Sequence, residues 1–306
     1  MQVILKAFRQ LATLPNVSNL SVGKTFTERG KGFTHCLSMD VPSKDALQAY
    51  STHPAHLQFV NGGIPVLELV AESNTIESRK DVGLFMLHGR GGSKDEFVKK
   101  YEDFFESLLN QLPVNLHLFL FDQRNHGDRQ IDEIHNKGIK TNPNHGIDMY
   151  SLQYGTANDV KYLMDTIPLF VKIDEWAIWG FSLGGHATLL ALTLDDRLKV
   201  GVSVVGCGDY KTLMADRNVI VTDELQNLLL KVDPINIPQT YKNKNILLLN
   251  GGKDTLVNSR SNDVFLATVQ SLTGNEKFQR IVDDDAGHVL SDLMKSKSVQ
   301  WFQSHL

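Results

Sequence analysis

Short apolar runs alternate with helical patterns through residues 79–306. Each run is bounded by polar or turn-forming residues, which is typical of strands buried on both faces of a sheet. The runs are residues 82–87, 116–121, 176–179, 200–205, 246–249 and 278–282. Because strands that alternate with helices form parallel sheets, we predict an α/β fold with a mostly parallel sheet and helices on both faces.

The first part of the chain has a different pattern, which predicts a small ferredoxin-like α+β domain. The elements expected there are a helix at 3–14, strands at 17–27 and 32–41, a helix that begins near Ser43, and a strand at 64–70. A polar, turn-like stretch near residues 71–81 then separates two apolar strands. We therefore predict domains over residues 1–78 and 79–306.

Two long connections interrupt the larger domain. Residues 128–150 are polar and rich in His, Asn and Gly, whereas residues 208–241 carry a helical pattern of their own. Long excursions at the carboxyl ends of strands usually border an active site. We expect residues 208–241 to form a cap over that site.

Composition and charge exclude several classes of protein. With 31 Lys and Arg against 35 Asp and Glu, the net charge is −4, which argues against a dedicated nucleic-acid binder. Cys36 and Cys207 form neither a disulfide framework nor a metal-ligand spacing, so we expect a reducing compartment and no cofactor or metal. Residues 176–194 are uncharged and long enough to suggest a membrane span. Their glycines, and a strand pattern followed by a helix pattern, indicate buried core instead.

The expected location is the cytoplasm, and two alternatives remain open. The chain ends in Ser304-His305-Leu306, which is similar to the Ser-Lys-Leu peroxisomal signal, although these residues also fit the end of an amphipathic helix. The first acidic residue is Glu28, so a mitochondrial presequence is the other alternative to a folded N-terminal helix.

The most specific motif is Gly180-Phe181-Ser182-Leu183-Gly184, between an apolar strand and a helical run. A strand that turns abruptly into a helix holds the serine in a strained conformation and exposes its hydroxyl. Glycines are needed on both sides, because a Cβ there would collide with a neighbouring strand or helix. Ser182 is therefore the candidate nucleophile.

Candidate partners for Ser182 follow in the chain order Ser, Asp, His. Asp254 follows the strand that ends near residue 249, and His288 follows the strand that ends near residue 282. This order is typical of one hydrolase fold and differs from the orders of trypsin-like and subtilisin-like proteases. Residues 283–285 are three further aspartates and rival acids, but they precede His288 on its own strand. We predict Asp254 as the acid and His288 as the base.

The glycine-rich stretch His88-Gly89-Arg90-Gly91-Gly92 follows the first strand of the larger domain. Such a loop presents backbone N–H groups to a developing oxyanion. We expect the N–H groups of Arg90 and Leu183 to be the donors. Alternatively, the Arg90 side chain would bind an acidic group of the substrate.

These motifs together resemble the serine α/β-hydrolases over residues 80–306. The further stretches Phe121-Asp122-Gln123-Arg124-Asn125-His126-Gly127 and Met149-Tyr150…Gly155-Thr156 are most similar to fungal esterase-like members. The resemblance implies structural roles for Asp122 and Arg124, which would brace the oxyanion loop. We interpret His186, one helical turn after Ser182, as a packed residue.

The N-terminal part resembles the stress-responsive dimeric α+β barrel (Dabb) family. The similarity lies in Gly32-Phe33-Thr34-His35-Cys36 and in residues 49–56, which include Tyr50, His53, Pro54 and His56. It implies a ferredoxin-like fold that dimerises through its sheet, and a cyclase-type site at His35, Tyr50 and His56. The alternative is that these side chains only fill the barrel. Residues 1–3 leave almost no room for the family's first strand, so we expect that strand to be missing.

The sequence thus predicts a serine hydrolase that cleaves small-molecule carboxylic esters through an acyl-enzyme. Thioesterase, peptidase and acyltransferase chemistry use the same groups and stay open. A further alternative is acyl-product release linked to a cyclase-like N-terminal domain. The last alternative is a non-catalytic protein of the same fold that only binds a ligand, because fold alone does not determine function.

Overall fold

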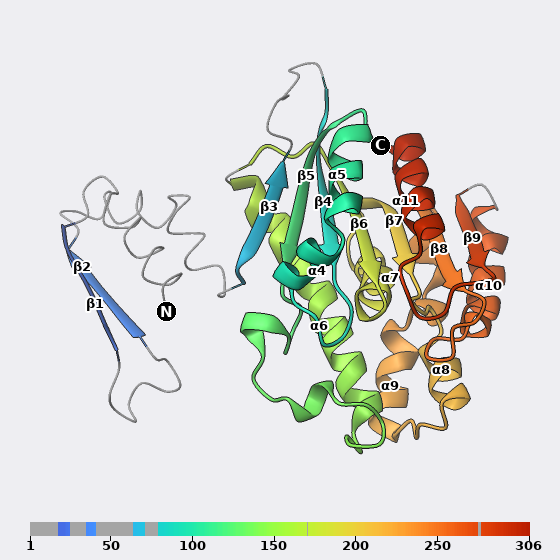
Figure 1. Cartoon of the computed structure of the whole chain (residues 1–306). Helices are drawn as coiled ribbons and strands as arrows, with labels where there is room; N and C mark the ends of the chain where they lie inside the picture. Colours follow the sequence, from blue (N-terminus) through green and yellow to red (C-terminus); the bar gives the residue numbers. More distant parts are fainter. Residues whose placement is uncertain (1–17, 25–34, 41–63, 71–78, 170, 275–276) are drawn as a thin grey trace. The chain divides into compact units, whose positions relative to one another are not determined.

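The structure, a computed structural model, describes residues 18–24, 35–40, 64–70, 79–169, 171–274 and 277–306 (Figure 1). It divides the chain into two units, Met1–Ile64 and Pro65–Leu306. In the first unit, β1 (Ser18–Lys24) pairs with β2 (His35–Asp40) in antiparallel orientation. These strands lie within the two strands predicted there. The two predicted N-terminal helices lie outside the described residues.

The second unit contains a seven-stranded sheet in the order β3-β5-β4-β6-β7-β8-β9. The strands are β3 (Val66–Val70), β4 (Asp81–Leu87), β5 (Asn115–Phe121), β6 (Glu175–Phe181), β7 (Leu198–Val204), β8 (Asn245–Gly251) and β9 (Phe278–Asp283). All are parallel except β3, which is antiparallel to β5. The six strands predicted for the larger domain are therefore present, and the predicted α/β class is confirmed.

The edge strand β3 lies in the larger unit, which differs from the boundary predicted after residue 78. Its residues pair with β5 from Val66↔Phe121 to Val70↔His117. Leu67 and Leu69 pack against the hydrophobic core of the large sheet. The polar stretch at 71–81, which suggested the domain boundary, therefore lies inside the second unit, between its first strand β3 and β4.

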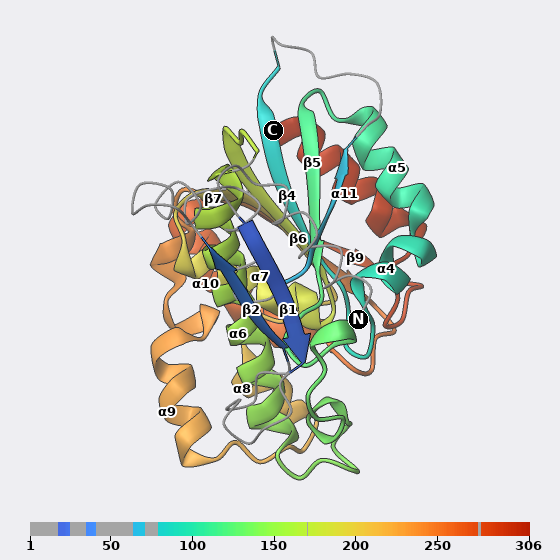
Figure 2. The same ribbon diagram turned by 90° about the vertical axis from the view of Figure 1, so that its left-hand side faces the viewer.

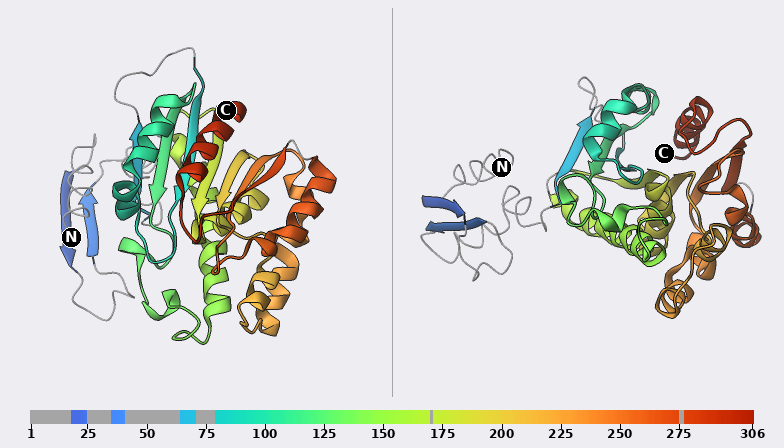
Figure 3. Two further views of the ribbon diagram at one scale, coloured as in Figure 1. Left: turned by 45° about the vertical axis from the view of Figure 1, so that its right-hand side comes forward. Right: turned by 60° about the horizontal axis from the view of Figure 1, so that its bottom comes forward.

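Helices cover both faces of the large sheet, as Figure 3 shows. They are α4 (Lys94–Lys100), α5 (Glu102–Gln111), α6 (His145–Thr166), α7 (Leu183–Leu194), α8 (Tyr210–Asp216), α9 (Asp223–Val232), α10 (Asp263–Thr273) and α11 (Asp292–His305). One face is covered by α4, α5 and α11, and the other by α6, α7 and α10. None of the helices in the described part of the chain combines the length and apolarity that crossing a membrane requires.

The core on the side of α4, α5 and α11 is built around Trp179 of the central strand β6. This side chain is fully buried, and its indole Nε1 donates a hydrogen bond to Ser298 Oγ of α11 at 3.0 Å. The Phe97 ring of α4 stacks on it with 5.8 Å between ring centroids. The uncharged run 176–194 is thus β6 followed by α7, which agrees with its interpretation as buried core.

The carboxyl ends of the parallel strands carry the longest connections. Figures 1 and 2 both show the segment after β5, together with α8 and α9, beyond this end of the sheet. The 208–241 connection forms α8, α9 and two short 3-10 helices, at Pro234–Asn236 and Pro238–Tyr241. Both long connections therefore border the edge of the sheet at which ligands of open α/β sheets bind.

Candidate active site

Ser182 lies in the sharp turn between β6 and α7. Its backbone has φ 54° and ψ −112°, a region that residues with a side chain rarely occupy. A Cβ on Gly180 would lie 2.1 Å from the carbonyl oxygen of Gly184, and a Cβ on Gly184 would lie 2.4 Å from that of Leu87. Both flanking positions therefore require glycine, for the steric reason that the sequence indicated.

The three predicted residues of the triad come together in this structure. Ser182 Oγ lies 2.7 Å from His288 Nε2, and His288 Nδ1 lies 2.8 Å from Asp254 Oδ2. Both distances are in the range of strong hydrogen bonds. Since the carboxylate accepts from Nδ1–H, the lone pair of Nε2 faces the serine hydroxyl. This is the arrangement in which an imidazole takes a proton from a nucleophile.

The environment of Asp254 keeps it ionised. Burial opposes the charge, but hydrogen bonds from His288 and from the N–H groups of Val257 and Leu256 hold the pKa of Asp254 below its ordinary value. The carboxylate is thus fixed by three donors and is available to orient the imidazole.

The rival aspartates are engaged elsewhere. Asp283 Oδ2 accepts from Ser291 Oγ at 2.6 Å, and Asp285 pairs with Lys253 at 2.7 Å. Asp284 is exposed, and among the described residues only Asp254 accepts a hydrogen bond from the ring of His288. The geometry therefore favours Asp254 over the other three.

The oxyanion loop is held against the nucleophile turn through His88. Its carbonyl oxygen accepts from Gly184 N at 3.2 Å and from the side chain of Gln123. Its ring is fully hydrogen-bonded, to Gly89 O at 2.8 Å and to Gln123 N at 3.1 Å, and burial lowers its pKa to about 4. Within the described residues, the N–H groups of Arg90 and Leu183 donate no hydrogen bond to a protein group. Both N–H groups are therefore free to donate to a ligand.

Asp122 and Arg124 take different positions. Asp122 accepts from Lys94 N at 2.7 Å and from Lys94 Nζ at 3.1 Å, so it ties the end of the oxyanion loop to the strand β5. Arg124 instead forms a two-pronged pair with Asp159 of α6, at 3.1 and 2.8 Å. The expected bracing role thus fits Asp122, whereas Arg124 holds α6.

A pocket of about 220 Å³ opens at Ser182. Several of its walls come from α6, which begins within the first long connection, and from the second connection. They are His145, Met149 and Gln153 of α6, and Tyr210, Leu213 and Arg217 from α8 and its end. The sequence marked both segments as bordering the site but identified none of these six side chains. The only indication in the sequence was that these residues lie in or next to long connections that follow the carboxyl ends of strands.

His186 also lines this pocket and is 5% exposed. Its Nδ1 lies 3.1 Å from Cys207 N, and burial lowers its pKa to about 4. A neutral ring with one nitrogen engaged by the backbone agrees with its interpretation as a packed residue. The Cys207 thiol is buried as well, and burial raises its pKa.

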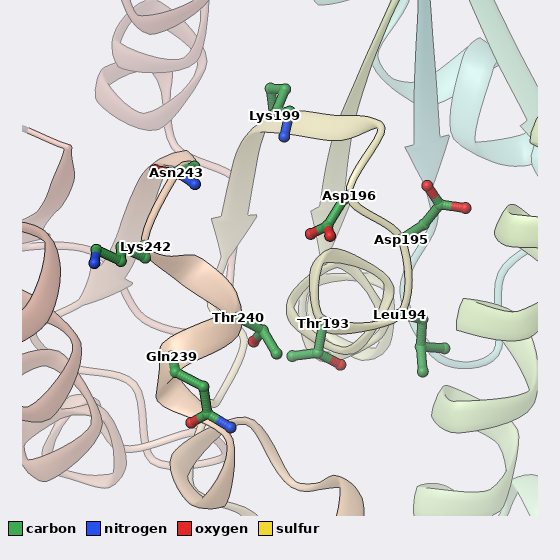
Figure 4. A pocket seen from close by; sticks show the side chains of 9 residues that line it. All are labelled: Thr193, Leu194, Asp195, Asp196, Lys199, Gln239, Thr240, Lys242 and Asn243. Atoms are coloured by element: carbon green, nitrogen blue, oxygen red, sulfur yellow. The ribbon is translucent and has the colours of Figure 1, made fainter.

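A second and larger pocket lies away from the triad (Figure 4). It measures about 410 Å³ and is lined by residues at the end of α7 and near the starts of β7 and β8. Its two aspartates are paired, Asp195 with Arg197 at 2.6 Å and Asp196 with Lys244 at 3.5 Å. It contains none of the candidate nucleophile, acid or base.

The candidate residues of the N-terminal part are not brought together by the described structure. Tyr50 and His56 lie outside the described residues. His35 begins β2, and only its backbone is described. The cyclase-type site stays a prediction.

Comparison with protein families finds a different match in each part of the chain, and the N-terminal match extends past the unit boundary to include β3. The model of the Stress responsive A/B Barrel Domain matches residues 1–75, and the Prolyl oligopeptidase family model matches residues 157–306. TT1662 from Thermus thermophilus has a TM-score of 0.65 and 21% identity, with 79% of this chain and 93% of that chain covered. Residues 65–306 have the α/β-hydrolase fold. The N-terminal resemblance to the Dabb family is also confirmed.

Two further proteins are similar to this chain. The esterase Pf2001 of Pyrococcus furiosus has a TM-score of 0.51 and 21% identity, with 82% of this chain and 95% of that chain covered. YitV of Bacillus subtilis (strain 168), which is named as an esterase, is 28% identical to this chain over 142 residues. That match covers 42% of this chain and 56% of YitV, so the chain spans little more than half the length of this curated relative.

Proposed function

We propose that the hydrolase unit cleaves carboxylic esters through an acyl-enzyme formed on Ser182. The observation that carries this proposal is the continuous hydrogen-bonded chain from Ser182 through His288 to Asp254, at 2.7 and 2.8 Å, beside a pocket. Relatives and structural neighbours with esterase names support the same reaction class.

In the first half of the reaction, Ser182 Oγ attacks the ester carbonyl carbon and its proton passes to His288 Nε2. Asp254 holds the imidazole in the required tautomer and stabilises the imidazolium. Negative charge develops on the carbonyl oxygen, where the N–H groups of Arg90 and Leu183 would donate hydrogen bonds. Leu183 is also the first residue of α7, and a helix N-terminus favours negative charge. One donor of this kind contributes about 10²–10³ in rate.

The tetrahedral intermediate then collapses as His288 returns the proton to the leaving alcohol. This leaves Ser182 acylated. A water molecule, activated by the same imidazole, attacks the acyl carbon, and the carboxylic acid is released with free serine restored. Every step uses groups of this chain and water.

Peptide hydrolysis is a second candidate, because the Prolyl oligopeptidase family model matches residues 157–306. The same nucleophile and base attack an amide, but the leaving amine needs a proton more strongly than an alcohol does. Comparison of p-nitrophenyl butyrate, butyryl-CoA and a butyryl p-nitroanilide on one preparation separates ester, thioester and amide chemistry. We expect the oxygen ester to have the highest kcat/KM and the Ser182→Ala variant to hydrolyse none of them. A preference for the anilide or for the thioester would overturn the ester assignment.

A further inference from the structure

Two arginines in the pocket at Ser182 have no acidic partner. Arg90 follows β4, and Arg217 forms the C-terminal cap of α8. Among the described residues, neither side chain forms a hydrogen bond or an ion pair with another protein group. Five other arginines of this unit each bind an aspartate: Arg124, Arg129, Arg197, Arg260 and Arg280. The pocket therefore contains cations that the protein leaves uncompensated.

The electrostatic surroundings of Arg217 agree with this. Burial lowers the pKa of Arg217, Tyr210 opposes that shift, and the positive charge of Arg90 adds to it. No carboxylate is among the groups that act on Arg217. The nearby acids have other cationic partners: Asp216 Oδ1 binds Arg260 at 2.6 Å, and Asp148 binds His135 at 2.8 Å. Asp216 Oδ2 has no hydrogen-bond partner among the described residues. Two neighbouring cations repel each other, and an anion bound beside both would relieve that repulsion.

Two buried polar side chains of the same pocket also have an unused atom. His145 is 1% exposed, and its Nδ1 lies 2.9 Å from Lys137 O, so its N–H is engaged there. Within the described residues, His145 Nε2 and Gln153 Oε1 have no hydrogen-bond partner. Gln153 is 4% exposed. Leaving such atoms without a partner costs free energy. Both are acceptors, so they would take a hydrogen bond from a hydroxyl or N–H group of a ligand and not from an anionic group.

We propose that the preferred substrate is an ester that carries a second, anionic group, which Arg217 and Arg90 bind while Ser182 attacks the ester carbonyl. A carboxylate and a phosphate share this chemistry, because both accept paired hydrogen bonds from a guanidinium. Arg217 and Arg90 act as specificity-determining residues through their side chains. This inference rests on the proposed ester hydrolysis, and it adds the class of substrate.

Matched esters test the proposal on the full chain. Phenyl butyrate, 4-carboxyphenyl butyrate and 4-(phosphonooxy)phenyl butyrate place no charge, a carboxylate or a phosphate on the alcohol. Ethyl hexanoate and monoethyl adipate make the same comparison on the acyl side. We expect kcat/KM to be at least about tenfold higher for one anionic ester than for its neutral partner, as a charge-assisted hydrogen bond would give. Added salt should reduce this ratio by screening. Neutral esters that react as well as their anionic partners in both series would overturn the proposal.

Arg217→Gln and Arg90→Gln identify the groups responsible. We expect each variant to lower the ratio of anionic to neutral kcat/KM several-fold, mainly through KM, since the anion lies away from the breaking bond. Arg217→Lys, which keeps the positive charge, should retain part of the preference for the anionic ester. The matched control is Arg197→Gln, which removes the same charge from ion pairs with Asp165 and Asp195 outside the pocket and should leave the ratio unchanged. If the ratio of anionic to neutral kcat/KM is unchanged in both pocket variants, Arg217 and Arg90 do not bind the anionic group.

Binding separates this inference from the proposed reaction. Titration calorimetry of the Ser182→Ala protein with 4-carboxyphenyl butyrate and phenyl butyrate needs no turnover. We expect the anionic ester to bind at least about tenfold more tightly, and the Ser182→Ala, Arg217→Gln double variant to lose that difference. Equal binding, or no binding of either ester, overturns the inference. Absence of Ser182-dependent hydrolysis in the wild type, with the binding preference intact, would instead overturn only the proposed function.

Discussion

Ser182 has a positive φ, and the residues around it explain why this conformation persists. Gly180 lets β6 approach α7, and Gly184 lets α7 approach Leu87 of β4, within distances that no Cβ permits. Ser182 N also donates to Val204 O at 2.8 Å, which ties the turn to the neighbouring strand. The sequence motif predicted the strained turn and its two glycines. It did not predict the bond to Val204, which comes from a strand distant in the sequence.

The pairing of Asp254 with His288 leads to a prediction at the same scale. Asp254→Asn should lower kcat by about 10⁴, the effect known for a triad acid, because it favours the wrong imidazole tautomer. Asp284→Asn, which changes an exposed carboxylate, should leave kcat within a few-fold. Steady-state kinetics on one ester compares the two variants. The opposite ranking would mean that another acid orients His288.

The buried pair of Asp122 and Lys94 leads to a prediction about stability. The two side chains are 1% and 10% exposed and lie 3.1 Å apart. Asp122→Ala should lower the free energy of unfolding by about 3 kcal/mol, because Lys94 and two backbone N–H groups lose their acceptor. Urea denaturation measures this change.

The control is Glu175→Ala, which removes an exposed ion pair with Lys80 at 2.8 Å. It should cost no more than about 1 kcal/mol. Equal costs for the two substitutions would mean that Asp122 is not a brace of the oxyanion loop.

At the scale of elements, the inner strands β4 to β8 were predictable because each is a mostly apolar run that is largely buried. The placement of β3 was not. Its pattern of alternating burial suits an edge strand of either unit, and only its pairing with β5 decides between them. The pocket side chains Arg217 and His145 escaped prediction for a similar reason. They come from segments far apart in the sequence, and local sequence patterns do not predict which distant segments contact each other.

The helices α8 and α9 of the 208–241 connection make the cap hypothesis testable. Leu213 of α8 is 1% exposed and lines the pocket, so Leu213→Ala should enlarge it and shift the preferred acyl chain to longer or bulkier groups. The measurement is kcat/KM across p-nitrophenyl esters of increasing acyl length.

Leu230→Ala on α9 is the matched control, since that side chain is 61% exposed. It should leave the acyl-length profile unchanged. If a folded Leu213→Ala variant has the wild-type profile as well, the segment does not form the acyl pocket.

At the scale of the whole molecule, the boundary between the two units determines which fragment can act alone. We propose that residues 65–306 fold and hydrolyse esters without the Dabb-like part, because they contain the complete sheet and every candidate catalytic group. A fragment of residues 79–306 lacks β3 and leaves β5 as an unpaired, apolar edge. Loss of the partly buried Leu67 and Leu69 alone should cost about 2–4 kcal/mol of stability.

Expression of both fragments beside the full chain tests this boundary by urea midpoint and specific activity. We expect 65–306 to match the full chain and 79–306 to be less stable. If neither fragment is active while the full chain is, the two parts form one functional unit. Dimerisation through the N-terminal part stays a prediction, which sedimentation of the full chain and of 65–306 would examine.

The central claim is that Ser182 is the nucleophile, and covalent labelling tests it most directly. Treatment of the full chain with a fluorophosphonate, followed by peptide mass spectrometry, should find one adduct, on Ser182. Ser182→Ala should be folded, with an unchanged melting temperature, and should not be labelled. Undiminished labelling of that variant, or an adduct on another residue of the wild type, would contradict the account.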